Sequence, residues 1–158
     1  MSSVNKNLSV FENEIPQLPK ARVSIVVAEW NKSVNQAMVD GAFQVLSEAK
    51  VPSEQISVCW VPGSFELILG SQREAQKEAV DAVIALGTVI QGETRHFDFI
   101  CNAVANGIAN VSLKYNKPVI FGVLTTDNQQ QAEERAGGKH GNKGAEAAYT
   151  ALRMMENG

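Results

Sequence analysis

The chain has 158 residues, 44% of them hydrophobic, and a formal net charge of −3. This length fits one domain with a sizeable core, and the acidic balance argues against a nucleic-acid-binding protein, which would present a basic face. Residues 1–20 lack the apolar segment of a secretory signal, and no apolar run is long enough to span a bilayer. We therefore expect a cytoplasmic protein that makes no membrane contact.

Hydrophobic patterns typical of strands and helices alternate along the chain. Strands are expected at residues 21–28, 55–61, 80–90 and 118–125, and helices at residues 33–49, 65–77, 97–115, 129–136 and 145–156. Ser33 is the expected cap of the first helix. This alternation implies a parallel sheet with right-handed crossovers. We predict a three-layer α/β/α sandwich with a four-stranded parallel sheet at residues 21–158, preceded by an N-terminal arm at residues 1–20.

Cys59 and Cys101 are the only cysteines, and each lies in an apolar segment. Two cysteines at this spacing form neither a disulfide framework nor a zinc pattern, so we expect two buried free thiols. The two histidines, His96 and His140, also lack ligand spacing, so no metal site is predicted.

Residues 87–98, GTVIQGETRHFD, connect the third strand to the long helix. Ligands bind at the carboxyl ends of parallel strands, and the free N–H groups of a helix start favour an anion. His96 can move protons near neutral pH. The other strand ends bring Trp30, residues 64–66 and residues 125–127 to the same edge.

Four sequence blocks resemble the lumazine synthases in order and spacing. They are residues 61–66 (VPGSFE), 87–98, 117–125 (KPVIFGVLT) and 131–148 (QAEERAGGKHGNKGAEAA). The resemblance implies a flavodoxin-like fold. It also implies condensation of 5-amino-6-(D-ribitylamino)uracil with 3,4-dihydroxy-2-butanone 4-phosphate to 6,7-dimethyl-8-ribityllumazine, without a metal or organic cofactor.

The resemblance assigns the uracil substrate to two turns. Trp30 would stack on the pyrimidine ring, where many family members carry Phe, and riboflavin could stack there too. Ser64, Phe65 and Glu66 would hold the ribityl chain and neighbouring ring groups. The pattern alone equally allows Ser64 to cap the following helix and Glu66 to favour its dipole.

The resemblance also places substrate on the third strand and the helix after it. Backbone groups of Thr88, Val89 and Ile90 would pair with the uracil, although the sequence alone equally describes an ordinary strand end. His96 is the candidate general acid–base, and without the resemblance it reads as a histidine at a helix start.

The phosphate is assigned to two further segments. Glu93 and Thr94 form the phosphate loop, with the Glu93 carboxylate expected to face solvent. Arg135 would clamp the phosphate in bidentate fashion, and Lys143 and, less surely, Lys139 add positive charge. A solvated basic cluster near helix ends is the alternative.

Family members form pentamers, and many assemble twelve pentamers into a shell. In them the residues matching Phe121, Arg135 and Lys143 reach a neighbouring subunit's site. The resemblance therefore predicts a homo-oligomer with shared sites. The short glycine-rich connection at residues 137–144 is similar to that of shell-forming members.

Two other functions stay open from the sequence. A non-catalytic flavin- or lumazine-binding protein could use the same scaffold, and it would hold flavin without making product. A phosphoacceptor signalling domain needs clustered acids after its first strand, whereas this chain has Glu29, Trp30 and Asn31 there.

Overall fold

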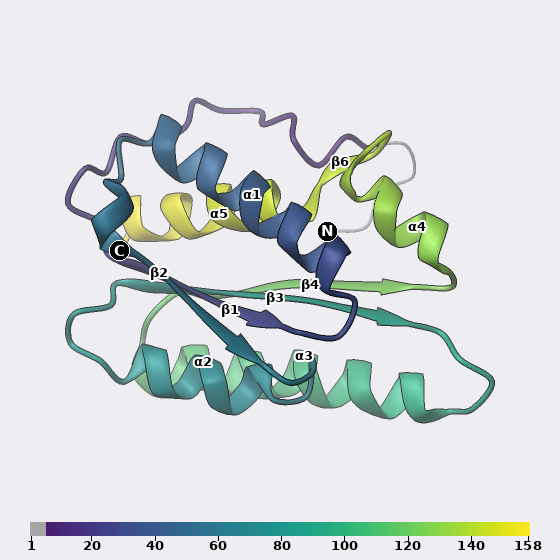
Figure 1. Cartoon of the computed structure of the whole chain (residues 1–158). Coiled ribbons are helices and arrows are strands. Elements are labelled where there is room, and N and C mark those ends of the chain that lie inside the picture. Colours follow the sequence, from purple (N-terminus) through teal and green to yellow (C-terminus); the bar gives the residue numbers. More distant parts are fainter. Residues whose placement is uncertain (1–5) are drawn as a thin grey trace.

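The computed structural model describes residues 6–158, so the first five residues of the predicted arm lie outside it. The central sheet contains four parallel strands in the order β2-β1-β3-β4, and helices cover both of its faces (Figure 1). The predicted α/β/α sandwich is confirmed. Its main elements are β1 (Val23–Ala28), α1 (Lys32–Glu48), β2 (Ile56–Val61), α2 (Leu67–Ala75), β3 (Ala82–Ile90), α3 (His96–Tyr115), β4 (Val119–Thr126), α4 (Gln129–Glu134) and α5 (Lys143–Glu156).

Alternating side chains of β1 and β3 build one core on each face of the sheet. Ile25 and Ile84 pack toward α1 and α5, whereas Val26 and Val83 pack toward α2 and α3. Because both faces are covered, all six residues of β1 are buried. The backbone between the two helix layers is therefore a rigid base for the loops at the strand ends.

The expected cap of α1 is wrong, and the alternative of a Ser64 cap on α2 is not realised. Helix α1 begins at Lys32, and its N-cap is Asn31 in the left-handed conformation (φ 63°) without a side-chain cap, so Ser33 does not cap it. Helix α2 begins at Leu67, with Glu66 at the N-cap and again no side-chain cap bond, so the Ser64 hydroxyl is not used for capping. Hydrogen bonds of Asn31 and Asn35, described below, hold the start of α1 instead.

Three short elements of the structure were not predicted from the sequence. β5 (Ala136–Gly138) and β6 (Gly141–Asn142) form a two-stranded antiparallel hairpin between α4 and α5. A 3-10 turn, η1 (Ser53–Gln55), precedes β2. Strands of two or three residues rich in glycine carry no alternating pattern that a sequence could reveal.

Burial differs from expectation in the cysteines. Cys59 and Cys101 are free but only partly buried. Cys59 lies on β2, an edge strand, and Cys101 on α3. Helix α3 also leaves large apolar side chains in solvent: Phe99 is 73% exposed and Leu113 is 81% exposed.

The described part of the N-terminal arm, residues 6–20, contains no helix or strand and crosses over α1 and α5 (Figure 1, purple). Ile15 and Leu18 pack against the core on that face, and the Leu18 N–H donates to Ala49 O at 2.9 Å. Within residues 6–158, no helix is both long and apolar enough to cross a membrane.

Candidate active site

A pocket of about 750 Å³ opens at the carboxyl ends of β1, β2 and β3. This is the edge at which parallel α/β sheets bind ligands. Eight residues predicted for the site line it, namely Trp30, Ser64, Phe65, Glu66, Thr88, Val89, Ile90 and His96. Four separate stretches of the chain thus meet around one cavity.

The end of β3 leaves one backbone edge unpaired at this pocket. β3 pairs with β1 as far as Leu86, but with β4 as far as Ile90. The Gln91 N–H donates to Thr126 O on the β4 side at 2.8 Å. Because successive residues of a strand direct their backbone groups to opposite neighbours, Thr88 and Ile90 direct theirs to the open side. A planar ligand with donors and acceptors can pair with that edge.

A buried asparagine ties the walls of the pocket together. Asn35 in α1 has no exposed surface, and its Nδ2 donates to Ala28 O and Trp30 O, both at 2.7 Å. Its Oδ1 accepts a hydrogen bond of 2.7 Å from the Thr88 hydroxyl. The Asn31 side chain donates to Thr88 O at 3.0 Å. These bonds fix the loop after β1 relative to the end of β3.

The Trp30 indole stands free in solvent, with 74% of its surface exposed. Gly63 lies beneath it, and a Cβ there would be 3.0 Å from Glu66 Oε2 and 3.6 Å from Trp30 Cδ1. The missing side chain at Gly63 therefore leaves room between the indole and the carboxylate. Phe65 is also half exposed at the same turn. An exposed aromatic face beside a carboxylate suits a ligand with a flat ring and hydroxyl groups.

His96 is the first residue of α3 and is exposed at the mouth of the pocket. The backbone nitrogen of His96 lies 3.4 Å from the Thr94 hydroxyl oxygen, to which it donates. Residues 91–95, which precede it, are all exposed, and nothing lies within 4 Å of a Cβ built on Gly92. The loop and the helix start can thus receive an anion beside an imidazole.

The remaining predicted site residues do not line this pocket in the single chain. Glu93 and Thr94 lie in the exposed loop before His96. Phe121 lies within β4, partly buried, and packs against the core beneath α2 and α3. Arg135 and Lys143 flank the β5–β6 hairpin.

Arg135 and Lys143, the two basic residues predicted to bind phosphate, are joined by a backbone hydrogen bond. The Lys143 N–H donates to Arg135 O at 2.8 Å. The Arg135 Nη1 donates to Gln131 O at 3.0 Å, and the Lys143 Nζ lies 3.1 Å from Glu146 Oε2. The Arg135 side chain is therefore held by α4 and the Lys143 side chain by α5, and neither lines the pocket.

Glu134 sits among the basic groups of this hairpin. Its carboxylate lies 3.0 Å from Lys139 Nζ and 3.9 Å from Arg135 Nη1. The hydrogen bond from Lys139, helped by Gln130 and by the charge of His140, holds the pKa of Glu134 below its usual range. The carboxylate thus stays ionised and orders the cations around it.

Cys101 is the nucleophilic side chain of α3 that the sequence pattern left unassigned. Burial raises the pKa of its thiol, and the Asp98 carboxylate adds to the shift. Because the thiolate is the reactive form, Cys101 is a poor nucleophile at neutral pH. Within residues 6–158, no three His, Cys, Asp or Glu side chains cluster closely enough to hold a metal ion.

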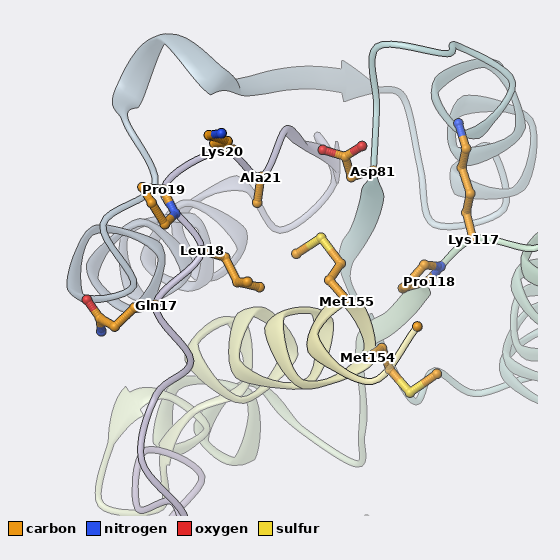
Figure 2. Close-up of a pocket in the computed structure, with 11 residues that line it drawn as sticks. Gln17, Leu18, Pro19, Lys20, Ala21, Asp81, Lys117, Pro118, Met154 and Met155 are labelled. Carbon is orange, nitrogen blue, oxygen red and sulfur yellow. The ribbon is translucent and has the colours of Figure 1, made fainter.

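A second cavity, of about 620 Å³, lies at the opposite edge of the sheet. Figure 2 shows Leu18 of the arm and Met155 of α5 pointing toward one another across it. Pro19, Ala21, Pro118 and Met154 complete the apolar lining, and the polar or charged residues Gln17, Lys20, Asp81 and Lys117 also line the cavity. No residue predicted for the site lines this cavity.

Four residues of the pocket region were missed by sequence reasoning: Asn31, Asn35, Gly63 and Ile100. Asn35 interrupts the apolar face of α1 formed by Val34 and Met38. A polar residue at a core position of a helix signals a buried hydrogen bond, although its partners could not be named from the sequence.

Comparison with known proteins adds a second line of support. The family model described as 6,7-dimethyl-8-ribityllumazine synthase matches residues 20–157. A protein of Cytophaga hutchinsonii with that name is 61% identical over 155 residues, covering 98% of both chains. Proteins with the same name are 47% identical over 156 residues in Parabacteroides distasonis, covering 98% of both chains, and 50% identical over 155 residues in Flavobacterium johnsoniae, covering 98% of this chain and 82% of the relative.

Proposed function

The chain belongs to the 6,7-dimethyl-8-ribityllumazine synthase family and catalyses the lumazine synthase reaction of riboflavin biosynthesis, and we propose that this reaction takes place in the pocket at the carboxyl ends of β1 to β3. The enzyme joins 5-amino-6-(D-ribitylamino)uracil to 3,4-dihydroxy-2-butanone 4-phosphate and releases phosphate and water. One observation carries the assignment: the exposed indole of Trp30, the open edge of β3 and the imidazole of His96 meet around one cavity.

The pyrimidine ring stacks on Trp30 and pairs with the end of β3. The Thr88 N–H and the backbone groups of Ile90, which face the side of β3 without a strand neighbour, support this orientation, since the edge of a uracil carries alternating donors and acceptors. The Thr88 carbonyl already accepts from the Asn31 side chain. Val89 completes the contact from the wall of the pocket. The Thr88 hydroxyl is engaged by Asn35, so recognition at this residue uses the backbone.

The ribityl chain lies along the turn after β2. Ser64, Phe65 and Glu66 line the pocket there, and neither Ser64 nor Glu66 is used in a side-chain cap of α2. A serine hydroxyl and a carboxylate supply a donor and strong acceptors for a polyhydroxyl chain.

The phosphate binds at the loop before α3. Backbone N–H groups of Glu93 and Thr94 and the start of α3 favour an anion there, with the Glu93 carboxylate turned to solvent. Arg135 and Lys143 bind the same phosphate from a neighbouring subunit. Neither residue lines the pocket of its own chain, which supports this division.

His96 moves protons during imine formation, loss of phosphate and ring closure. Its exposed position between the pocket and the phosphate loop supports that role. Holding two reactants side by side can itself contribute about 7–11 kcal/mol to a condensation. Proton transfer by His96 then adds to a rate that proximity already raises.

The enzyme acts as a pentamer with shared sites, and twelve pentamers form a shell. Exposed Phe99 and Leu113 on α3 support burial against another copy, because exposed apolar patches of this kind mark interfaces. The Phe121 ring completes the neighbour's site. We also assign the enzyme to the cytoplasm, because two free, partly buried thiols suit a reducing compartment.

Supplying both substrates and following product absorbance and fluorescence tests the activity at this site. We expect product with the parent chain and a large loss with His96→Ala. Native mass then tests assembly, with five or sixty times the subunit mass of 17.1 kDa expected. A yellow protein that holds flavin but forms no product would contradict the proposal.

Mixed oligomers test the shared site directly. His96→Ala and Arg135→Ala chains, each strongly impaired alone, are co-expressed with different tags. If the two residues come from different subunits, some sites in a mixed particle are intact and part of the activity returns. If both residues served the same chain's site, every site would lack one of them and no activity would return.

A further inference from the structure

The N-terminal arm touches the hairpin that carries the phosphate cations. The Leu8 N–H donates to His140 O at 2.8 Å, and the Asn142 N–H donates to the Ser9 hydroxyl oxygen at 3.0 Å. The arm is ordered locally, because Asn7 Oδ1 accepts a bond of 2.8 Å from the Ser9 N–H. Two hydrogen bonds thus join segments more than a hundred residues apart in sequence.

The hairpin is shaped to receive this arm. Gly141 has a φ of +83°, and a Cβ built on it would lie 2.7 Å from the backbone nitrogens of Leu8 and Ser9. Only glycine allows so close an approach with that backbone conformation. Phe11 stacks on Tyr149 of α5, with ring centroids 4.2 Å apart, and anchors the arm beside the hairpin.

Asn142 connects the arm to Lys143 and Arg135. Its Oδ1 accepts from the Gly144 N–H at 2.8 Å and caps α5, in which Lys143 is the first residue. Its Nδ2 donates to Ala37 O of α1 at 2.9 Å. The next residue, Lys143, is bonded through its N–H to Arg135 O. Asn142, which donates to Ser9, is therefore adjacent to Lys143, and Lys143 is in turn hydrogen-bonded to Arg135.

We propose that residues 7–11 are a positioning element of the phosphate half of the active site, with Ser9 as its central contact. This inference rests on the proposed role of Arg135 and Lys143 in phosphate binding. The arm holds the β5–β6 hairpin against α1, so that both cations project from a fixed backbone. Loosening the arm weakens binding of the butanone phosphate and leaves binding of the pyrimidine substrate unchanged.

Ser9→Ala tests this through the two Michaelis constants. Loss of one ordinary hydrogen bond of about 1 kcal/mol predicts a rise of about fivefold in KM for the butanone phosphate. The KM for the pyrimidine and the native mass stay unchanged. Ser9→Thr restores the hydroxyl and returns KM toward the parent value.

Gln17→Ala is the matched control within the same arm. The Gln17 side chain donates to Glu48 O at 3.0 Å, far along the arm from the hairpin, so its loss leaves both KM values unchanged. Equal KM values in Ser9→Ala and Gln17→Ala would overturn the inference. A rise in both KM values of Ser9→Ala would also overturn it, because it would indicate a general structural loss.

Two further measurements separate this inference from the proposed function. Amide exchange at Asn142 reports the loosened hairpin directly and should accelerate in Ser9→Ala. Arg135→Ala should raise KM for the butanone phosphate far more than Ser9→Ala does. If Arg135→Ala left that KM unchanged, the phosphate assignment would fail. If Arg135→Ala raised it while Ser9→Ala changed only the exchange rate, the role of the arm alone would fail.

Discussion

The two edges of the sheet hold cavities of comparable size, about 750 Å³ at the carboxyl ends of the strands and about 620 Å³ at the amino ends. The first is lined by an exposed indole, an imidazole, a carboxylate and an unpaired strand edge. The second is lined mainly by Leu18, two prolines and Met155 (Figure 2). Size therefore does not distinguish the proposed active site from the second cavity, whereas the aromatic and polar side chains that line it do.

Charged groups are present at both edges but are used differently. At the amino edge, Arg22 Nη2 lies 2.7 Å from Asp81 Oδ1, and the Lys117 Nζ donates to Lys77 O at 2.7 Å. These bonds fasten one loop to another. The comparison predicts that changes to exposed side chains at the carboxyl edge alter catalysis and spare stability, and that changes at the amino edge do the reverse.

The largest effect is expected for His96→Ala. Positioned proton transfer contributes about 10² to 10⁴ in rate, and we expect a loss of about 10² in kcat because proximity supplies much of the remainder. The side chain is exposed, so the thermal midpoint should not change. Asn110→Ala, an exposed position farther along α3, is the control. Unchanged turnover in His96→Ala would break the assignment.

Trp30→Ala should weaken binding of the pyrimidine substrate by about tenfold or more, since stacking on an aromatic side chain is worth about 1–3 kcal/mol per base. Riboflavin should quench Trp30 fluorescence for the same reason. Trp60→Phe is the control, because Trp60 lies on β2 outside the pocket lining and its loss should preserve the quenching. Quenching that survives in Trp30→Ala would place the flavin elsewhere.

Asn35→Leu should affect both stability and binding, because Asn35 joins the core to the pocket. Its removal leaves two backbone carbonyls and the Thr88 hydroxyl without their bonds. We expect a loss of about 2 kcal/mol in the free energy of unfolding, together with weaker pyrimidine binding. Gln36→Ala, at the exposed neighbouring position, should change neither. A fully stable Asn35→Leu would contradict the network.

Met155→Ala tests the amino edge. Fully buried Met→Ala changes cost about 2–5 kcal/mol, and Met155 is only partly buried against the core, so we expect about 1 kcal/mol, measured by denaturant unfolding. Both KM values should stay at the parent level. Met154→Ala is the control, because Met154 is 54% exposed and should cost little. A change in KM for either substrate would show that this cavity communicates with the site.

The sequence predicted the residues at the carboxyl edge of the sheet better than the buried residues that hold them in place. Parallel strands must end at one edge, so Trp30, Glu66 and His96 could be brought together from chain order alone. Asn35 acts through Thr88, which is 53 residues away, and no local pattern encodes that pairing. Ser33 was wrongly expected as a cap for the same reason, since hydrogen bonds of Asn31 and Asn35 with Thr88 hold the start of α1.

Helical periodicity also did not distinguish the buried apolar residues of α3 from the exposed ones. Val104 and Ile108 of α3 pack in their own core, whereas Phe99 and Leu113 at similar spacing are exposed. The pattern marks apolar positions only, and burial of Phe99 and Leu113 against another copy is part of the proposed assembly. The β5–β6 hairpin was missed because its glycines favour turns over strands.

The smallest effect is expected for Asp81→Asn, and it should depend on pH. Hydrogen bonds from the Arg22 guanidinium hold the pKa of Asp81 below its usual range, with partial burial opposing them. A carboxyl whose folded pKa is depressed stabilises the fold above its unfolded pKa of about 3.9, and this contribution is lost as pH falls through the folded value. The thermal midpoints of parent and Asp81→Asn should therefore differ at pH 7 and converge once the pH falls below the folded pKa.

The difference at pH 7 should be less than that for Met155→Ala, because solvent screens an ion pair at the surface. Arg22→Gln should reproduce the same pH dependence, and the double variant should lose no more than either single change. Product formation at pH 7 should be unchanged in all three. A midpoint difference that persists into acid would mean that Asp81 stabilises the loop by packing, and the amino edge would then be held together by shape instead of charge.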